Sequence, residues 1–226
     1  MRKKLNPLTE IPEEGSVSSD YFFRMMSPKA TKLAENYLDD ETNLLESTID
    51  KLDNPKEFNL IAVAGGQLGM LKTGMEKTKN YTCIEPLADL YLGKQIQYLT
   101  KKVENVHIIK KRFAETTRKD LFPGRNIFVF MFNILAYIKN PLGEINDLIR
   151  PGDILFISTW NTTSKAKEIR TRYFNYLNSF ENEIVIDPEN TIGICDLKLF
   201  PFDSLRYPEK HTYYKTDVVE ILEIKL

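Results

Sequence analysis

The sequence predicts a mixed α/β domain whose sheet is mostly parallel and covered by helices on both faces. From residue 58 onward, short apolar runs alternate with longer amphipathic stretches, which is the pattern of strands separated by helices. The run from Ile127 to Phe132 contains no polar residue, as is typical of a strand that is buried on both faces. Five such strands interleaved with helices favour a parallel sheet with right-handed crossovers.

The composition allows a sizeable core and gives no general affinity for polyanions. Of the 226 residues, 42% are hydrophobic and 28% are charged, which is close to the average for globular proteins. The formal net charge of -1 leaves no basic field that would attract nucleic acid or an anionic membrane. We therefore expect neither a nucleic-acid partner nor a membrane partner.

No segment has the pattern of a membrane span, a signal peptide or a metal site. No apolar stretch approaches about 18 residues. The basic residues Arg2, Lys3 and Lys4 precede a polar, proline-containing stretch rather than an apolar run. Cys83 and Cys195 are far apart and have neither a metal-ligand nor a redox spacing. We expect a cytoplasmic protein without a bound metal.

Residues 1–56 are predicted to form an arm and a helical cap. Residues 1–19 contain prolines, acidic residues and a small polar stretch, which is typical of a flexible or loosely docked arm. After an apolar patch, Ser27 and Pro28 open a helical pattern, and a second helical pattern covers 44–52. The remaining residues, 57–226, are assigned to the second and larger domain.

Strands and helices are expected to alternate through the first part of the larger domain. Short apolar runs predict strands there, and stretches with helical periodicity predict helices. The expected strands are 60–64, 81–84, 106–109, 127–132 and 154–159, and the expected helices are 68–79, 87–101 and 142–149.

The last part of the chain has a different pattern. A long helix is expected over 164–180, followed by two strand candidates at 183–186 and 191–194. The segment 200–214 is polar and rich in aromatic residues and carries no strand prediction. The alternating apolar residues of 218–224 predict a final strand.

A glycine-rich turn follows the first strand of the larger domain. The strand runs into Gly65, Gly66, Gln67 and Gly69, and a helix is expected directly afterwards. Glycines at such a turn let the backbone approach a ligand and present amide groups at a helix N-terminus. An ordinary turn has the same composition, so this feature alone leaves both interpretations open.

An acidic residue ends the second strand. Glu85 lies 20 residues after Gly65, the spacing at which nucleotide-binding folds carry a carboxylate that accepts both ribose hydroxyls. The alternative is that Glu85 caps the helix that begins at Pro86. Together with the glycines, Glu85 favours ribose binding.

The order of these features resembles the class I S-adenosylmethionine-dependent methyltransferases. The segments 60–69, 81–85, 105–109 and 127–136 look like the first four motifs of that family. The turn Arg150-Pro151-Gly152-Asp153 before an apolar strand is the most specific match, and the resemblance covers about 58–160. It implies a Rossmann-like, doubly wound sheet of seven strands. It also implies S-adenosyl-L-methionine as cofactor and methyl transfer to nitrogen or oxygen of a small molecule.

The resemblance also implies site residues. Phe113 would stack on the adenine, the Ala114 amide would meet an adenine ring nitrogen, and Tyr137 is the first candidate for contact with the reacting substrate. The residues implied in cofactor binding are Gly65, Gly66, Gln67, Gly69, Glu85, Pro86, Phe113, Ala114, Asn133 and Leu135.

Residues outside the motifs are expected to build the acceptor side. Tyr21 and Arg24 would close over the cofactor as a lid and reach a ligand carboxylate, although the same segment could simply pack its helix on the sheet. Trp160 and other aromatic residues after it suggest a partly apolar acceptor pocket. Methyl transfer needs no catalytic triad, and His107 and His211 are read as a core or edge residue and as a surface residue. The sequence is compatible with a homodimer.

The sequence departs from the family at several positions. Val63 stands where many members have an acidic residue, Gln67 replaces a motif glycine, and Arg112 stands near the usual adenine-binding acid. These departures keep two alternatives open. One is transfer or cyclisation of the aminocarboxypropyl arm of the same cofactor. The other is a non-catalytic partner subunit with a degenerate cofactor site.

Overall fold

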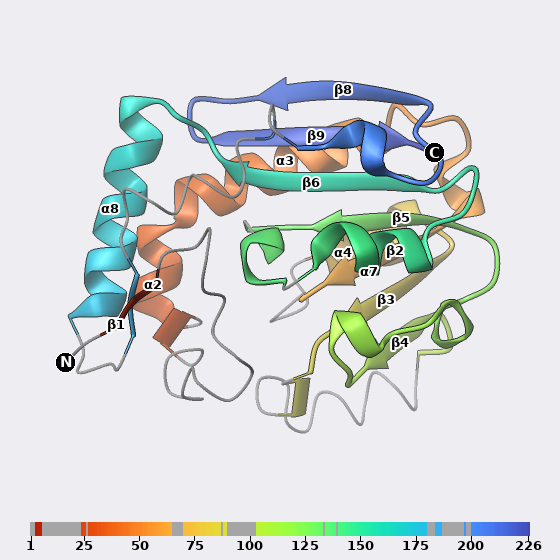
Figure 1. The fold of residues 1–226 in the computed structure, drawn as a ribbon, viewed down its shortest axis with the longest axis horizontal. Helices are drawn as coiled ribbons and strands as arrows, with labels where there is room; N and C mark the ends of the chain where they lie inside the picture. Colours follow the sequence, from red (N-terminus) through yellow and green to blue (C-terminus); the bar gives the residue numbers. More distant parts are fainter. Residues whose placement is uncertain are drawn as a thin grey trace.

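The computed structural model describes residues 3–5, 24–25, 27–64, 70–86, 88–89, 103–132, 134–138, 140–179, 184–186, 197 and 200–226. Within this part of the chain, seven strands form one sheet in the order β4-β3-β2-β5-β6-β9-β8 (Figure 1). These strands are β2 (Phe58–Val63), β3 (Asn80–Ile84), β4 (Val106–Ile109), β5 (Arg125–Phe130), β6 (Ile154–Trp160), β8 (Lys210–Lys215) and β9 (Val219–Lys225).

The sheet is mostly parallel, as the sequence predicts. The strands from β4 to β6 are parallel, β9 is antiparallel to β6, and β8 is antiparallel to β9. The chain builds outward from β2 to β4 and then returns to the other side of β2 with β5. Ligands of open α/β sheets bind beyond the carboxyl ends of the strands at such a reversal of strand order.

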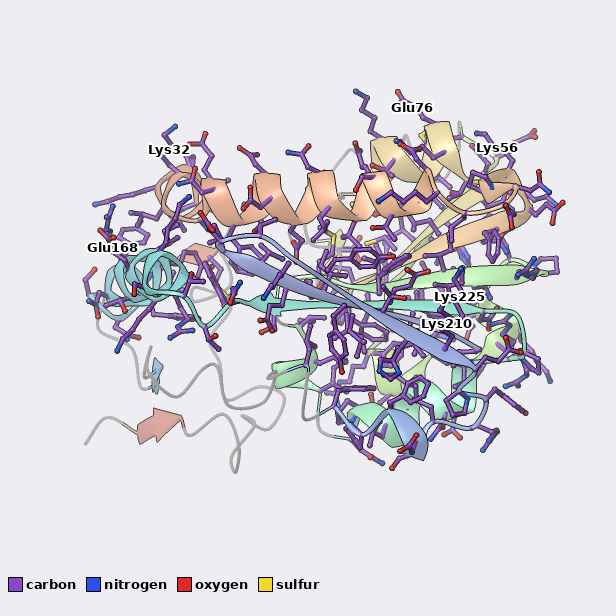
Figure 2. All side chains as sticks on the ribbon, turned by 90° about the horizontal axis from the view of Figure 1, so that it is seen from above. Lys32, Lys56, Glu76, Glu168, Lys210 and Lys225 are labelled. Carbon is purple, nitrogen blue, oxygen red and sulfur yellow. The ribbon has the colours of Figure 1, made fainter. Side chains whose placement is uncertain are left out.

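Helices cover both faces of the sheet, which confirms the doubly wound arrangement. Helices α3 (Glu35–Ile49) and α4 (Leu71–Lys77) lie on one face, and α7 (Pro141–Leu148) lies on the other (Figure 2). Successive residues of β2 point to opposite faces of the sheet. Leu60 packs in a buried cluster with Ile49 of α3, and Ile61 packs in another with Ile145 of α7. This alternation explains why the central strands are mostly apolar.

The expected N-terminal helices are present and join the core. Helix α2 (Pro28–Leu33) begins at Ser27, whose hydroxyl accepts a hydrogen bond from the backbone N–H of Ala30 at 3.2 Å. Helix α8 (Ser164–Asn178) starts beside β6 and runs past the sheet to pack against α2 (Figure 1). No helix in the described ranges is long and apolar enough to cross a membrane. The division of the chain at residue 56 stays a prediction.

Two strands differ from the sequence interpretation. Lys3–Leu5, within the expected flexible arm, form β1 and pair in parallel with β7 (Ile184–Ile186) in a separate small sheet. The predicted strand at 183–186 is thus real but lies outside the main sheet. The pairing of β1 with β7 joins residues about 180 positions apart, and such a pairing leaves no local signal in the sequence.

The sequence pattern does not predict strand β8. This strand begins in the polar segment 200–214, and it forms because it can pair with β9 across a short turn. Among the described strands it is an edge strand with one neighbour, and its side chains are mostly exposed, with exposed lysines, Lys210 and Lys215, at its two ends. The rest of two predicted elements, the helix 87–101 beyond residues 88–89 and the strand 191–194, lies outside the described residues.

The turn 150–153 is fixed by a buried carboxylate. Asp153 accepts hydrogen bonds from the backbone N–H groups of Asn126 at 2.8 Å and Arg150 at 2.9 Å. The guanidinium of Arg118 donates to both of its oxygens, at 2.7 Å and 3.2 Å. Gly152 has a φ of +84°, a conformation that glycine adopts without strain. The turn therefore aligns the starts of β5 and β6.

Candidate functional site

The glycine-rich segment follows directly from a strained strand end. Ala64, the residue after β2, has a φ of +48°, and its N–H donates to the carbonyl oxygen of Ile84 on β3 at 2.8 Å. A left-handed conformation is unfavourable for alanine, so tertiary contacts must hold it. The cofactor candidates Gly65, Gly66, Gln67 and Gly69 lie outside the described residues. The described chain resumes at Met70, before α4.

Glu85 lies beside this strand end. It follows β3, whose Ile84 pairs with Val63 of β2, and it is only 6% exposed. Its N–H donates to Ile109 on β4 at 3.0 Å, and its backbone carbonyl accepts from Ala88 at 3.1 Å. The structure therefore brings Glu85 next to Ala64, the last described residue before the glycine-rich segment. Its role toward a ribose stays a prediction, as does that of the exposed Pro86.

The adenine candidates follow β4. Phe113 and Ala114 begin a short 3-10 helix, Phe113–Glu115. The Phe113 ring is buried and meets Phe130 of β5 edge to face, with 5.3 Å between the ring centroids. Ala114 is exposed. The structure places both residues on the α7 side of the sheet, and their contact with adenine stays a prediction.

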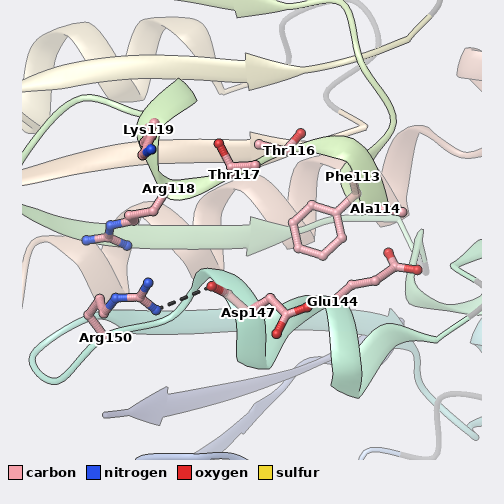
Figure 3. Close-up of a pocket in the computed structure, with 9 residues that line it drawn as sticks. All are labelled: Phe113, Ala114, Thr116, Thr117, Arg118, Lys119, Glu144, Asp147 and Arg150. Atoms are coloured by element: carbon pink, nitrogen blue, oxygen red, sulfur yellow. Dashed lines mark hydrogen bonds between the residues drawn. The ribbon is translucent and has the colours of Figure 1, made fainter.

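A pocket of about 420 Å³ adjoins these two residues (Figure 3). It lies between the segment 113–119 and helix α7, and its walls carry both positive and negative side chains. Burial raises the pKa of the Glu144 carboxyl, while the backbone of Asn140 lowers it. The lining residues are Phe113, Ala114, Thr116, Thr117, Arg118, Lys119, Glu144, Asp147 and Arg150. Glu85 is not among them, so this pocket covers at most the predicted adenine end of the site.

The chain leaves β5 through a second strained residue. Phe132 has a φ of +51°, and a 3-10 helix, Ile134–Tyr137, follows. Leu135 is buried in the cluster on the α7 side. Asn133 lies outside the described residues, as does the side chain of Tyr137. Their predicted roles at the boundary of cofactor and substrate are therefore untested.

Trp160 is placed differently from its expected role. It ends β6 with only 1% of its surface exposed, and its ring lies 4.1 Å from that of Tyr37 and 5.9 Å from that of Phe132, centroid to centroid. These contacts place Trp160 in the core. Its ring has little exposed surface that a substrate could touch, so its role in substrate binding stays a prediction. Arg24 is half-buried just before α2, and Tyr21 lies outside the described residues.

The histidines are both exposed. His107 lies on the edge strand β4, and His211 lies on β8 with its ring 4.4 Å from that of Phe202. Within the described ranges, no group of three histidine, cysteine, aspartate or glutamate residues is arranged to hold a metal ion.

The sequence interpretation missed Glu41. This residue of α3 is completely buried, and burial raises the pKa of its carboxyl to about 7, against hydrogen bonds from Phe132, Ser158 and Tyr37 that lower it. A signal was present, because Glu41 lies four residues after Tyr37 and four before Leu45, on the apolar stripe of the helix. An acidic residue on such a stripe indicates a buried polar contact.

Comparisons with known proteins bear on the fold. No protein-family model matches the chain, and no curated protein matches it. A SAM-dependent methyltransferase from Aquifex aeolicus is 15% identical, with 86% of this chain and 97% of that chain covered and a TM-score of 0.51. The magnesium protoporphyrin IX methyltransferase of Synechocystis PCC 6803, solved with bound SAH, is 11% identical, with 92% and 94% covered and a TM-score of 0.52. The chain therefore has the Rossmann-like fold of the class I S-adenosylmethionine-dependent methyltransferases.

Proposed function

We propose that the chain transfers a methyl group from S-adenosylmethionine to a nitrogen or oxygen atom of a small molecule. The observation that carries this proposal is the position of Glu85, at the end of β3 and beside the strand end that leads into the glycine-rich segment. This juxtaposition occurs where the strand order reverses, which is where this class of fold binds its ligands. The fold itself, with methyltransferases as its structural neighbours, supports the same reading.

The residues present fit the cofactor. A nearly buried carboxylate such as Glu85 can accept both hydroxyls of a ribose, and it would disfavour a 2′-phosphate. The backbone amides of the glycine-rich segment would meet the methionine part, and Phe113 with Ala114 would meet the adenine. When bound, the cofactor supplies a sulfonium that makes its methyl group electrophilic.

The chain's own residues have a limited task in such a reaction. They must hold the acceptor in line, exclude water and receive or release a proton where the acceptor loses one. Phe132 of the turn after β5 and Trp160 at the end of β6 both pack against Tyr37 of α3, and this aromatic cluster supports exclusion of water. Tyr137 is the proposed substrate contact, and Tyr21 and Arg24 are the proposed lid.

The charge of the chain bears on the kind of acceptor. A compact acceptor rather than a nucleic acid agrees with a net charge of -1. We propose a cytoplasmic location, and a homodimer is one arrangement to examine. Neither nitrogen nor oxygen is favoured by any described residue.

One observation favours a second candidate, a partner subunit that has lost catalysis. Val63, which stands where many members of the family have an acid, is 2% exposed and part of the apolar cluster beside α7. A site without that acid could bind the cofactor weakly or not at all. Transfer of the aminocarboxypropyl arm would differ again, because it releases methylthioadenosine instead of S-adenosylhomocysteine.

Calorimetric titration with S-adenosylmethionine and S-adenosylhomocysteine tests the proposal. We expect micromolar binding by the wild type and a loss of about tenfold to 100-fold in Glu85→Ala, because hydrogen bonds to a charged group contribute about 1.5–3 kcal/mol. Glu209→Ala is the matched control, since Glu209 is exposed just before β8 at the far edge of the sheet. If the folded wild type binds neither ligand, the methyltransferase proposal is wrong and the non-catalytic partner subunit becomes the better interpretation.

A further inference from the structure

A completely buried carboxyl lies beside the carboxyl ends of β5 and β6. It belongs to Glu41 in the middle of α3, on the helix stripe that faces the sheet. Burial raises the pKa of this carboxyl to about 7. The proposed cofactor and acceptor contacts do not use it.

One oxygen of this carboxyl joins three elements. Glu41 Oε1 accepts hydrogen bonds from the hydroxyl of Tyr37 at 3.1 Å, from the backbone N–H of Phe132 at 2.7 Å and from the hydroxyl of Ser158. These donors come from α3 itself, from the turn after β5 and from β6. The other oxygen, Oε2, is buried and has no hydrogen-bond partner among the residues that the structure describes. All of its hydrogen bonding therefore converges on one point.

The bond to Phe132 falls on a residue in an unfavourable conformation. Phe132 has a φ of +51°, which a bulky residue adopts only where its surroundings hold it. Its ring is held edge-on by Tyr37 at 5.1 Å and by Tyr173 of α8 at 5.5 Å, centroid to centroid. Glu41 supplies the polar part of this support. The path of the chain into residues 133–137 begins at this point.

We propose that Glu41 is a positioning residue that fixes the turn after β5 relative to β6, and thereby the acceptor side of the proposed methyltransferase site. The proposal rests on the proposed function only for the meaning of the turn, because Asn133 and Tyr137 are its expected contacts. The Glu41 bonds themselves do not depend on it. A purely packing role would be met by an apolar side chain, which would avoid the desolvation of a carboxyl.

Ionisation of Glu41 would change the strength of this support. The groups that face the carboxyl are the hydroxyl of Tyr37 from α3, the hydroxyl of Ser158 from β6 and the N–H of Phe132 from the turn. Hydrogen bonds to a carboxylate are shorter and stronger than those to a neutral acid. The turn should therefore be held more firmly when Glu41 is ionised.

Amide hydrogen exchange tests the proposal without any ligand. The N–H of Phe132 donates directly to Glu41, so exchange in the segment 131–138 reports on the bond. We expect exchange at least tenfold faster in Glu41→Leu than in the wild type, and largely restored protection in Glu41→Gln, which keeps an acceptor oxygen. Glu35→Gln, an exposed acid on the same helix, is the control and should match the wild type.

Cofactor binding supplies the second measurement. In calorimetric titrations with S-adenosylhomocysteine, we expect Glu41→Leu to bind at least tenfold more weakly, with Glu41→Gln close to the wild type. Between pH 6 and pH 8, the wild type should gain affinity, and Glu41→Gln should gain less. A packing residue would produce no such pH profile and no rescue by glutamine.

The outcomes separate the two proposals. Unchanged exchange of 131–138 in a folded Glu41→Leu protein overturns the positioning role, whatever the ligand results are. Equal losses of affinity in Glu41→Leu and Glu41→Gln, with no pH dependence in the wild type, overturn it as well. A wild type that binds no S-adenosylhomocysteine while exchange rises in Glu41→Leu removes the proposed function and leaves the control of the turn by Glu41 in place.

Discussion

Replacing Glu41 by glutamine should change how the stability of the protein depends on pH. The pKa of this carboxyl is raised from 4.5 to about 7 in the folded chain, chiefly by burial. The folded state therefore keeps a proton that the unfolded state has already released. The contribution of Glu41 to the free energy of unfolding falls as pH rises from about 4.5 to about 7, and it stays constant above that range.

The size of this effect follows from the shift in pKa. A shift of about 2.5 units at about 1.4 kcal/mol per unit corresponds to about 3 kcal/mol between the two ends of the pH range. Glutamine cannot titrate, so Glu41→Gln should lack this loss. Other groups act equally in both proteins. One is Asp120, whose pKa the Lys111 ammonium and the Thr117 backbone lower to about 2.

Urea unfolding at several pH values between 4.5 and 8 measures the effect. The difference in unfolding free energy between the wild type and Glu41→Gln should change by about 3 kcal/mol across the range, in the direction that disfavours the wild type at high pH. The fluorescence of Trp160, the only tryptophan, can follow the transition because its ring packs on Tyr37. A difference that is independent of pH would refute the reasoning, because Glu41 would then titrate alike in both states.

Two further substitutions test the start of the sheet and the proposed adenine contact. Asp153→Ala should lower the free energy of unfolding by about 3–5 kcal/mol in urea titrations, because it leaves the Arg118 guanidinium and two backbone N–H groups without their acceptor. Lys32→Ala, which removes an exposed ion pair, should cost less than about 1 kcal/mol, and equal effects would contradict the assignment. Phe113→Leu should weaken binding of S-adenosylhomocysteine about two- to tenfold in calorimetry through the loss of ring stacking. Unchanged affinity would remove Phe113 from the site.

The strands with the clearest apolar runs in the sequence are the central ones, which are buried on both faces. Burial on both faces favours apolar side chains, so β2, β5 and β6 appear in the sequence as largely apolar runs with a few buried polar residues such as Asn59 and Ser158. Strand β8 does not, because one of its sides meets solvent and its pairing depends on β9. The pairing of β1 with β7 depends on a partner about 180 residues away, beyond the reach of any local pattern.

In the candidate site, too, residues fixed by local sequence are predictable and residues fixed by distant contacts are not. The place of Glu85 follows from spacing along the chain, since a strand end and a turn fix it locally. The environment of Glu41 could not be predicted, because two of its three donors, Phe132 and Ser158, come from elements about 90 and 117 residues further along the chain. A polar residue on an apolar helix stripe indicates that a partner exists, and only the fold can identify it.

The two exposed lysines at the ends of β8 have a consequence for self-association. Within the described part of the chain, this strand is an edge of the seven-stranded sheet, where backbone groups can pair with another chain. If a second copy docked edge to edge in antiparallel register, its Lys210 would approach Lys215 of the first, and both pairs of ammonium groups would repel. Like charges at the two ends of β8 therefore oppose edge-to-edge pairing of two copies through this strand.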